Sequence, residues 1–596
     1  MTETGWPNLV SMFFAQAERF GERPLLWRKR DGQYQPETWR EVAARVSALA
    51  RGLRHLGVAK GDRVVLVCEN RPAWLIADLA IMASGGITVP AYTTNTAADH
   101  RYILENSGAR GVIVSGGKVA ERLLAAVREV PAVRFVVGLE PLDEQLLPSG
   151  VTAIAWDDAV ARGDGDHVNV VAEAAALVPD DPACIIYTSG TGGAPKGVLL
   201  PHRSILHNCA GAVEVLAELE TGDDAFLSFL PLSHAYEHTV GQFVPIALGA
   251  EIYYAESVEK VAANLLEAHP TILSAVPRFF EMLQHRIVQG VHKAPGWRRK
   301  LFAMTLALGR KRLQAGARLS LAERIADAAL DRLVRGTVRA RFGGRLKAMV
   351  SGGAPLNPEV AEFFLALGVP IYQGYGQTET GPLISVNRVG RIKLDAVGPP
   401  VSNTEIRIAE DGEIQVRGPL VMLGYWRNEE ATREAVRDGW LHTGDIGSVD
   451  ADGFLRITDR KKDIIVNSGG DNISPARIEN LLTQRPEIGQ AMVYGDKRPH
   501  LVALIVPNGE WLRQWAKAAG KDGDAAALAA DPDLHAALGK AIEAVNGSLA
   551  VVERLRRFAV APEPFSLENG QMTPTLKIRR HVIRQAYGPV LEGLYR

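Results

Sequence analysis

The chain has 596 residues, of which 47% are hydrophobic and 23% charged, and its formal net charge is −1 at pH 7. This length exceeds what one hydrophobic core supports, so we expect at least two domains. The near-neutral charge excludes the global positive field of a nucleic-acid-binding protein, and no nucleic-acid partner is expected.

The cysteines and the N-terminus indicate the compartment. The three cysteines cannot all pair and none lies in a C-x-x-C spacing, so we expect a reducing compartment with neither a disulfide framework nor a zinc site. The N-terminus lacks a basic stretch followed by a sustained apolar run, so no signal peptide is expected. The apolar stretch 74–92 is interrupted by Asp78, Gly85, Gly86 and Pro90. It predicts a buried helix followed by a strand. The cysteine usage and the lack of a signal peptide predict a cytoplasmic location.

In roughly the first 450 residues, short β-branched runs alternate with amphipathic helical stretches. The runs are 63–68, 111–114, 134–137 and 183–186. This alternation predicts an α/β fold with largely parallel sheets, in which ligands gather at loops beyond the carboxyl ends of strands.

A basic segment follows. Between residues 286 and 345 there are 15 Lys and Arg against three acids, which are Glu323, Asp327 and Asp331. Such a bias is typical of a solvated face on surface helices. It also fits attraction to anionic lipid or to phosphate groups, so peripheral membrane contact stays open.

From about residue 404 the pattern changes. The runs 404–408 and 413–417 flank Asp411-Gly412 and predict a hairpin, and Asp452-Gly453 marks a second turn. We expect a β-rich subdomain over about 395–458 that completes an N-terminal domain of residues 1–461. Ser474 before Pro475 predicts a helix start, and 491–494 and 501–506 predict paired strands. These elements indicate a small, mobile α+β C-terminal domain over 462–596.

The strongest local signal is the sequence from Tyr187 to Gly197, YTSGTGGAPKG, directly after an apolar strand. Its backbone N–H groups and hydroxyls can surround a polyanion. It is not a Walker A loop, because Pro195 precedes the lysine and Gly197 follows it. The candidate phosphate-binding residues are Thr188, Ser189, Gly190, Thr191 and Lys196.

This loop resembles the phosphate-binding signature of adenylate-forming enzymes, the superfamily of acyl-CoA synthetases, luciferases and adenylation domains. Further motifs of that superfamily follow in family order over nearly the whole chain: 351–355, 372–380, 440–447, 459–463 and 572–580. Each motif alone could be a glycine-rich turn or a solvated run of charges; together they indicate the family.

The resemblance implies roles for individual residues. Gly352, Gly353 and Ala354 would lie against adenine, Tyr375 would stack on it, and Gln373, Gly374 and Gly376 would complete that loop. Thr378 would contact the α-phosphate, Glu379 and Thr188 would help to hold Mg²⁺, and Asp445 would accept hydrogen bonds from the ribose. Arg460 would contact ribose and phosphate, Lys462 would be the hinge between domains, and Lys577 would be the catalytic lysine, with Thr188 and Glu379 also in catalytic roles.

The resemblance also implies the reaction: ATP-dependent ligation of a carboxylic acid to coenzyme A through an acyl-adenylate, with release of pyrophosphate and AMP. The stretches 61–64, 69–74 and 459–470 resemble long-chain fatty acid–CoA ligases in particular. The expected acyl-pocket residues are His234, Val276, Pro277 and Gly353. A histidine between apolar residues is also typical of an ordinary core position.

Two alternatives remain open. The acyl group could pass to a carrier protein instead of free coenzyme A, since the same motifs serve both acceptors. The chain could also be a non-catalytic nucleotide- or lipid-binding protein on the same scaffold, although Glu379, Asp445, Arg460 and Lys577 are all present. A homodimer is a further open alternative.

Overall fold

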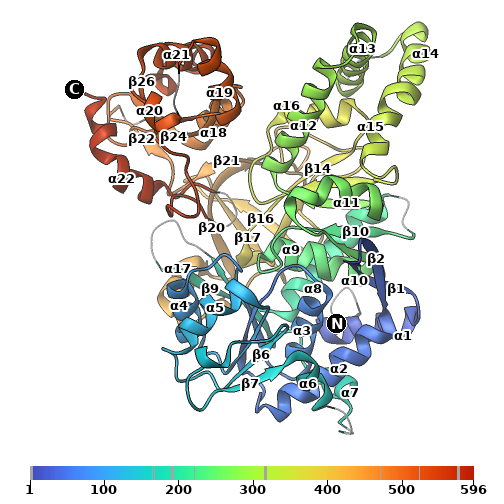
Figure 1. The fold of residues 1–596 in the computed structure, drawn as a ribbon. Coiled ribbons are helices and arrows are strands. Elements are labelled where there is room, and N and C mark those ends of the chain that lie inside the picture. The colour runs from blue at the N-terminus through green and yellow to red at the C-terminus, as the bar shows by residue number, and fades with distance from the viewer. Residues whose placement is uncertain are drawn as a thin grey trace.

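The computed structural model describes residues 5–163, 166, 168–188, 194–219, 222–314, 318–469, 471–521, 524–573 and 577–596. It confirms the expected α/β class: two large sheets, both mainly parallel, form the N-terminal part of the molecule. A β-rich sheet adjoins them, and a smaller α+β body carries the C-terminus (Figure 1).

Within the described residues, the first large sheet has eight strands. In spatial order they are β15 (Leu383–Val386), β14 (Ile371–Gly376), β13 (Ala348–Ser351), β12 (Ile272–Ala275), β10 (Ala225–Ser228), β11 (Glu251–Tyr254), β1 (Pro24–Arg30) and β2 (Gln33–Thr38). The six inner strands are parallel, and the two edge strands are antiparallel to their neighbours. The carboxyl ends of β13 and β14 therefore lie side by side.

The second large sheet also has eight described strands. Their order is β18 (Gly424–Tyr425), β9 (Lys196–Pro201), β8 (Pro182–Thr188), β4 (Ile87–Pro90), β3 (Arg63–Val67), β5 (Gly111–Val114), β6 (Phe135–Gly138) and β7 (Thr152–Ala155). The strands predicted from β-branched runs are confirmed as β3, β5, β6 and β8. The antiparallel pair β8–β9 encloses the glycine-rich loop.

Helices cover and connect these sheets (Figure 1). The apolar stretch at 74–92 forms the buried helix α3 (Pro72–Ala83) and then β4, as expected. The helices that flank the second sheet and the start of the chain are α1 (Leu9–Phe20), α2 (Trp39–His55), α4 (Ala97–Ser107), α5 (Gly117–Val127), α6 (Trp156–Ala161) and α7 (Val170–Ala174). Those that follow are α8 (His202–Ala217), α9 (Ala235–His238), α10 (Val244–Leu248), α11 (Val261–Ala268), α12 (Pro277–His292), α13 (Gly296–Leu313), α14 (Leu321–Leu330), α15 (Gly336–Arg341) and α16 (Pro358–Ala366).

The third sheet contains both predicted hairpins. Strand β16 (Glu405–Ile408) pairs with β17 (Glu413–Arg417) across Asp411-Gly412, and β20 (Trp440–Val449) pairs with β21 (Leu455–Arg460) across Asp452-Gly453. Strand β17 also pairs with β20, and β20 with β19 (Val436–Arg437), which follows α17 (Glu429–Ala435). This sheet places Asp445 and Arg460 directly opposite each other.

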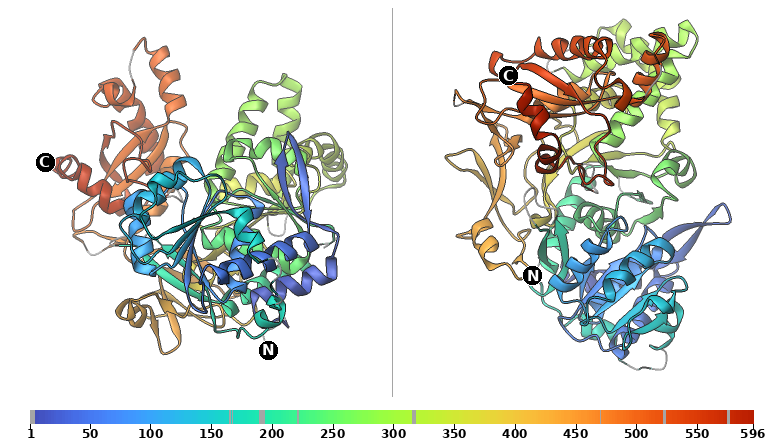
Figure 2. Two further views of the ribbon diagram at one scale, coloured as in Figure 1. Left: turned by 60° about the horizontal axis from the view of Figure 1, so that its bottom comes forward. Right: turned by 60° about the vertical axis from the view of Figure 1, so that its left-hand side comes forward.

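The C-terminal body has its own apolar core, which includes Ile478, Leu482, Leu501 and Leu538. Ser474 caps α18 (Pro475–Thr483) as predicted, and β24 (Ile488–Tyr494) pairs with β25 (Leu501–Pro507). The remaining elements are β22 (Ile465–Val466), β23 (Asn472–Ile473), α19 (Gly509–Ala518), α20 (Ala525–Leu528), α21 (Pro532–Asn546), β26 (Leu555–Val560) and α22 (Arg580–Gly593). Figure 2 shows this body above the β-rich sheet and beside the helices α12–α15.

The cysteines are buried in the N-terminal part. Cys68 follows β3, Cys184 lies in β8 and Cys209 lies in α8, and all three are free thiols. Burial raises the pKa of each thiol above its usual value. No helix among the described residues combines the length and the apolarity that crossing a bilayer requires.

Candidate active site

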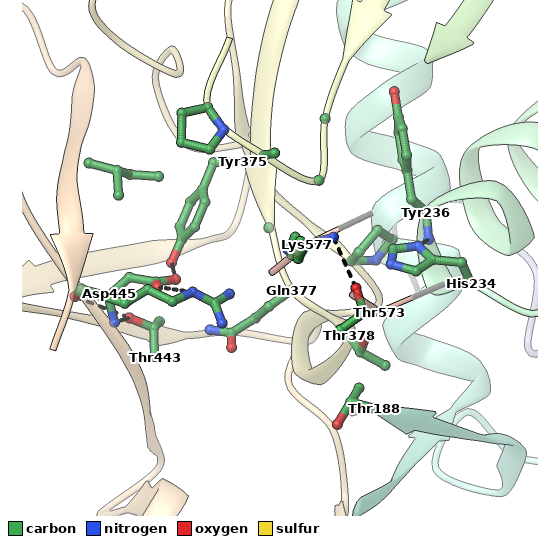
Figure 3. A pocket seen from close by; sticks show the side chains of 18 of the residues that line it. Thr188, His234, Tyr236, Tyr375, Gln377, Thr378, Thr443, Asp445, Thr573 and Lys577 are labelled. Carbon is green, nitrogen blue, oxygen red and sulfur yellow. Dashed lines mark hydrogen bonds and ion pairs between the residues drawn. The ribbon is translucent and has the colours of Figure 1, made fainter. Parts of the chain in front are cut away.

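A cavity of about 1890 Å³ lies where the two large sheets, the β-rich sheet and the C-terminal body meet (Figure 3). Most residues predicted from the motifs line it: Thr188, Lys196, His234, Gly352, Gly353, Ala354, Gln373, Gly374, Tyr375, Gly376, Thr378, Glu379, Asp445, Arg460, Lys462 and Lys577. Ser189, Gly190 and Thr191 lie outside the described residues. Segments hundreds of residues apart therefore converge on one cavity.

Val276 and Pro277 are not among the described residues that line this cavity. Val276 is the N-cap of α12 and Pro277 is the first residue of that helix. The Val276 side chain instead lies beside the Gly353 backbone, 3.8 Å from where a Cβ on that glycine would stand. Val276 therefore lies against the loop that follows β13.

The phosphate side of the cavity begins at Thr188, the last residue of β8. Its hydroxyl donates to the carbonyl of Lys196 across the β8–β9 pair (3.4 Å). The Lys196 ammonium lies 4.8 Å from the ring centroid of Tyr425, and the Tyr425 hydroxyl donates to Glu379 Oε1 (2.8 Å). The side chains of Lys196, Glu379, Thr188 and Tyr425 thus provide one cation, one carboxylate and two hydroxyls on this side of the cavity.

The loops after β13 and β14 form a flat, glycine-lined wall. A Cβ on Gly352 would approach the ring of Tyr236 to 3.1 Å, and one on Gly376 would lie 1.7 Å from the carbonyl of Pro382. The approach at Gly376 is to backbone and leaves no space for a side chain, so only glycine fits there. Tyr375 lines the same cavity.

Tyr375, Asp445 and Arg460 form a hydrogen-bonded set. The Tyr375 hydroxyl donates to Asp445 Oδ2 (2.6 Å), and Arg460 Nε lies 3.3 Å from Asp445 Oδ1. Burial, with a smaller contribution from Asp445, raises the pKa of Tyr375 well above its usual value, so the phenol stays a donor. The Asp445 carboxylate is itself buried, and its remaining acceptor capacity faces a cavity wide enough for a ribose.

The turn Thr378–Thr380 is fixed from behind. Asn208 on α8 donates to the carbonyl of Thr380 (2.8 Å), and the Thr239 hydroxyl donates to the carbonyl of Gly381 (2.7 Å). These contacts hold Thr378 and Glu379 against the cavity before any ligand binds.

Lys577 is brought into the cavity by the C-terminal body. Its backbone N–H donates to Thr573 Oγ1 (3.1 Å), and the Thr573 backbone N–H donates to the carbonyl of Lys577 (2.8 Å). Lys577 is exposed where it lines the cavity. Desolvation, and then the nearby Arg460, lower the pKa of its ammonium to about 8, although Asp445 and Glu379 oppose the shift.

His234 lies across from Lys577 (Figure 3). It caps α9, and its Nδ1 accepts the N–H of Tyr236 (3.1 Å), which leaves the proton of the neutral ring on Nε2. Burial, and then the charge of Lys577, lower the pKa of His234 to about 4. At neutral pH the imidazole is therefore uncharged and suits an uncharged acyl group beside it.

The segment around Lys462 joins the two bodies. Lys461 on one side pairs with Asp411 (2.5 Å) and Glu413 (3.2 Å) of the β-rich sheet. On the other side, Asp463 lies 3.9 Å from Arg580, which binds both oxygens of the buried Glu479 in the C-terminal body (2.6 and 2.5 Å). Lys462 is exposed between these two anchored neighbours.

Sequence reasoning missed two cavity residues. Tyr425 lies in the two-residue strand β18, outside all of the motifs, and the pairing of β18 with β9 brings it to Glu379. Gln377 lies inside the 372–380 motif, and its Nε2 is a buried donor with no partner among the described residues. Its place between Gly376 and Thr378 was the available signal.

The residues fit ATP with Mg²⁺. No cluster of three or more His, Cys, Asp or Glu able to hold a metal occurs in the described ranges. Mg²⁺ is commonly held by one or two protein carboxylates and by substrate phosphates, so Glu379 and the Thr188 hydroxyl, which line the same cavity, are a sufficient protein contribution. The unpaired Gln377 donor and the Lys196 ammonium suit the remaining phosphate and ribose oxygens.

Comparison with known sequences gives a consistent result. The pattern of the AMP-binding enzyme family matches residues 13–426, and that of the AMP-binding enzyme C-terminal domain matches residues 462–596. The Long-chain-fatty-acid–CoA ligase FadD15 of Mycobacterium bovis is 36% identical over 99% of this chain and 97% of its own length. The peroxisomal Long chain acyl-CoA synthetase 6 of Arabidopsis thaliana is 33% identical, over 95% and 82%. Human Long-chain-fatty-acid–CoA ligase 6 is 31% identical, over 96% and 85%.

Solved structures share the fold. The adenylation domain of a carboxylate reductase from Mycobacterium chelonae superposes with a TM-score of 0.74 at 22% identity, covering 99% of this chain and 91% of that one. The o-succinylbenzoate–CoA synthetase of Bacillus subtilis, in complex with AMP, gives 0.68 at 23% identity, over 96% and 97%. The full-length sequence relatives, the matched family patterns and the shared fold agree: the chain belongs to the AMP-binding enzyme family.

Proposed function

We propose that this protein is an AMP-forming ligase that joins a long-chain fatty acid to coenzyme A through an acyl-adenylate. One observation carries the proposal: Lys577 enters, from the C-terminal body, the same cavity in which the N-terminal body presents Tyr375, Asp445, Arg460 and Glu379. The similarity to long-chain fatty acid–CoA ligases over nearly their whole lengths supports this acid and this acceptor.

In the first half-reaction, a fatty-acid carboxylate oxygen attacks the α-phosphorus of ATP, and the bond to pyrophosphate breaks. Both reactants are anions, so the principal task of the site is to neutralise and position them. Tyr375, Asp445 and Gln377 orient the adenosine, while Thr378, Lys196 and Arg460 take phosphate oxygens. The Lys577 ammonium bridges the carboxylate and the phosphoryl group as charge develops. Mg²⁺, when bound at Glu379 and Thr188, neutralises charge on the departing phosphates.

In the second half-reaction, the coenzyme A sulfur bonds to the acyl carbonyl carbon, the thiol proton is released, and AMP leaves with the electrons of the acyl–phosphate bond. The thiol needs the space beside the acyl carbonyl that Lys577 occupies here. We propose that the C-terminal domain, residues 462–596, rotates about Lys462 between the two half-reactions. The anchored neighbours Lys461 and Asp463 support this pivot, because each is tied to a different body.

The test is pyrophosphate release and thioester formation with purified protein, ATP, Mg²⁺ and saturated acids from acetate to arachidate. We expect the highest kcat/KM with palmitate or stearate, because each buried methylene adds about 0.8 kcal/mol of binding. Parallel reactions with coenzyme A and with acyl carrier protein separate the two acceptors. If the acyl group is transferred to the carrier protein and not to coenzyme A, the acyl-AMP ligase alternative replaces this proposal. If no acid stimulates pyrophosphate release, the non-catalytic binding protein remains as the alternative.

A further inference from the structure

Tyr425 joins two charged side chains on the phosphate side of the cavity. Its hydroxyl donates to Glu379 Oε1 (2.8 Å), and the Lys196 ammonium lies 4.8 Å from the centroid of its ring. All three residues line the cavity. The proposed chemistry assigns Glu379 to Mg²⁺ and Lys196 to phosphate oxygens, but it gives Tyr425 no part. One side chain thus contacts two groups of opposite charge, the carboxylate with its hydroxyl and the ammonium with its ring.

The backbone around Tyr425 is fixed to the strand that begins with this lysine. Strand β18 pairs with β9 and places Tyr425 opposite Val198. The Tyr425 backbone N–H donates to Thr432 Oγ1 on α17 (2.8 Å), and the backbone N–H of Trp426 donates to the carbonyl of Gly197 (2.7 Å). The tyrosine is therefore held at one place relative to β9 before a nucleotide binds.

Lys196 keeps its charge available in this arrangement. The Tyr102 hydroxyl donates to the carbonyl of Pro195 (2.7 Å), directly before the lysine, and the Thr188 hydroxyl donates to the carbonyl of Lys196 itself (3.4 Å). Among the described residues, no carboxylate forms an ion pair with Lys196. The face of an aromatic ring attracts an ammonium group without neutralising it. Tyr425 thus helps to orient the lysine and leaves its charge for an anionic ligand.

Glu379 is held in a complementary way. The backbone N–H of Met422, which lies just before β18, donates to the Glu379 carbonyl (2.9 Å). The Tyr425 hydroxyl occupies Oε1, whereas Oε2 accepts no hydrogen bond within the described part of the chain. A neutral donor orders a carboxylate and leaves its negative charge for a cation, whereas a lysine or arginine in the same place would neutralise it.

We propose that Tyr425 is a positioning residue for the β- and γ-phosphates of ATP and for the Mg²⁺ that accompanies them. Its hydroxyl orients the Glu379 carboxylate toward the cation, and its ring orients the Lys196 ammonium toward the phosphate oxygens. The inference rests on the proposed function and adds to it a residue that lies outside all of the motifs. Because AMP has neither a β- nor a γ-phosphate, its binding should not depend on this tyrosine.

Isothermal titration calorimetry without fatty acid measures the binding of each nucleotide while no ligation takes place. Tyr425→Phe keeps the ring and removes the hydroxyl. It should weaken the binding of ATP in the presence of Mg²⁺ about tenfold, because loss of the partner that orients a metal ligand typically lowers metal affinity by this factor or more. The binding of ATP in EDTA and the binding of AMP should change by less than about twofold, because neither brings a cation to Glu379.

Tyr425→Leu removes both the hydroxyl and the ring. It should weaken the binding of ATP with Mg²⁺ more than Tyr425→Phe does. It should also weaken the binding of ATP in EDTA about threefold, since the contact between the ring and the Lys196 ammonium is lost. AMP binding should again be unchanged. The two variants therefore separate the role of the hydroxyl from that of the ring.

A double variant tests whether the hydroxyl acts through the carboxylate. Glu379→Ala/Tyr425→Phe should bind ATP with Mg²⁺ no more weakly than Glu379→Ala alone, because both changes remove the same interaction. The matched control is Tyr34→Phe. It removes a hydroxyl that donates to the carbonyl of Tyr254 (3.1 Å), and Tyr34 is not among the described residues that line the cavity. This control should bind every nucleotide as wild type does.

The inference fails if Tyr425→Phe binds ATP with Mg²⁺ as wild type does. It also fails if the same variant weakens AMP binding equally, which would make the tyrosine a structural residue only, or if the effects of Glu379→Ala and Tyr425→Phe add. Wild-type protein that binds neither nucleotide would overturn the proposed function, and this inference with it. Circular dichroism and retained AMP binding show that each variant is folded.

Discussion

The two bodies contribute to the cavity in different ways. On the N-terminal side, Tyr375, Asp445 and Arg460 hold one another through direct hydrogen bonds and an ion pair, and Asn208 fixes the neighbouring turn. On the C-terminal side, Lys577 reaches the cavity, and its backbone N–H donates to Thr573 Oγ1. In the proposed mechanism, the first side binds the nucleotide in both half-reactions, whereas the second acts only while its body is in this orientation.

The contacts between the bodies fit this division. The described side-chain hydrogen bonds across the boundary include Ser474 to the carbonyl of Thr458 (3.3 Å) and Gln289 to Glu510 (3.5 Å), both long and exposed. Each body has its own apolar core. We therefore predict that substitutions on the two sides change the rates of the two half-reactions to different extents.

Lys577→Ala should have the largest effect. Loss of a charge positioned for the transition state is expected to lower acid-dependent pyrophosphate release about 100- to 1000-fold. Thioester formation from preformed acyl-adenylate should change by less than about threefold, because that step does not use this lysine. Lys540→Ala, an exposed lysine on α21, is the control. Equal losses in both half-reactions would remove the distinction between the two sides.

Asp445→Ala should act on both half-reactions. Both ATP and the acyl-adenylate carry a ribose whose hydroxyls would donate hydrogen bonds to this carboxylate. The substitution also removes the acceptor of the Tyr375 hydroxyl. We expect KM for ATP and for acyl-adenylate to rise about 10- to 100-fold, the usual cost of losing hydrogen bonds to a charged group. Steady-state kinetics of each half-reaction measure this, with Glu410→Ala, an exposed residue in the turn between β16 and β17, as control. A rise confined to ATP would contradict the assignment to ribose.

Lys462→Pro tests the pivot. Proline fixes φ, so the domain should rotate less readily, and thioester formation should fall at least about tenfold more than adenylation. Lys462→Ala removes the same charge without the backbone restriction and should retain both activities. The pivot would have to lie elsewhere if the proline variant lost both half-reactions equally.

The pH dependence should be the smallest effect. The Lys577 ammonium is the required form, and with a pKa of about 8 it is present below that pH and lost as pH rises. The kcat/KM for ATP in pyrophosphate release reports ionisations of the free enzyme and should fall about fivefold from about pH 8 to about pH 9. In Lys577→Arg the guanidinium stays charged, so this alkaline limb should disappear. A limb that persists there would belong to another group.

The sequence predicted the parts of the site that follow strands. Residues 352–354 come directly after β13, residues 375–379 span the end of β14 and the turn after it, and Thr188 ends β8, so carboxyl ends of strands bring them together. Paired strands placed Asp445 opposite Arg460 within a predicted hairpin. At these positions the sequence motifs and the order of the strands both predict residues that line one cavity.

Elsewhere the sequence was insufficient. Tyr425 reaches Glu379 only through a short edge pairing, and Val276 with Pro277 starts a helix behind the cavity instead of lining it. The sequence shows the excess of basic residues in 286–345, but it does not show in which direction each charged side chain points. That direction depends on which arginines meet Asp327 and its neighbours after the helices pack.

The buried thiols have a practical consequence for enzymology. A disulfide reagent reacts with thiolates, and burial keeps Cys68, Cys184 and Cys209 both inaccessible and protonated. The native enzyme should therefore add little to a chromogenic titration of sulfhydryl groups. Disappearance of free coenzyme can then be followed continuously, and colour contributed by the protein itself would signal that it has begun to unfold.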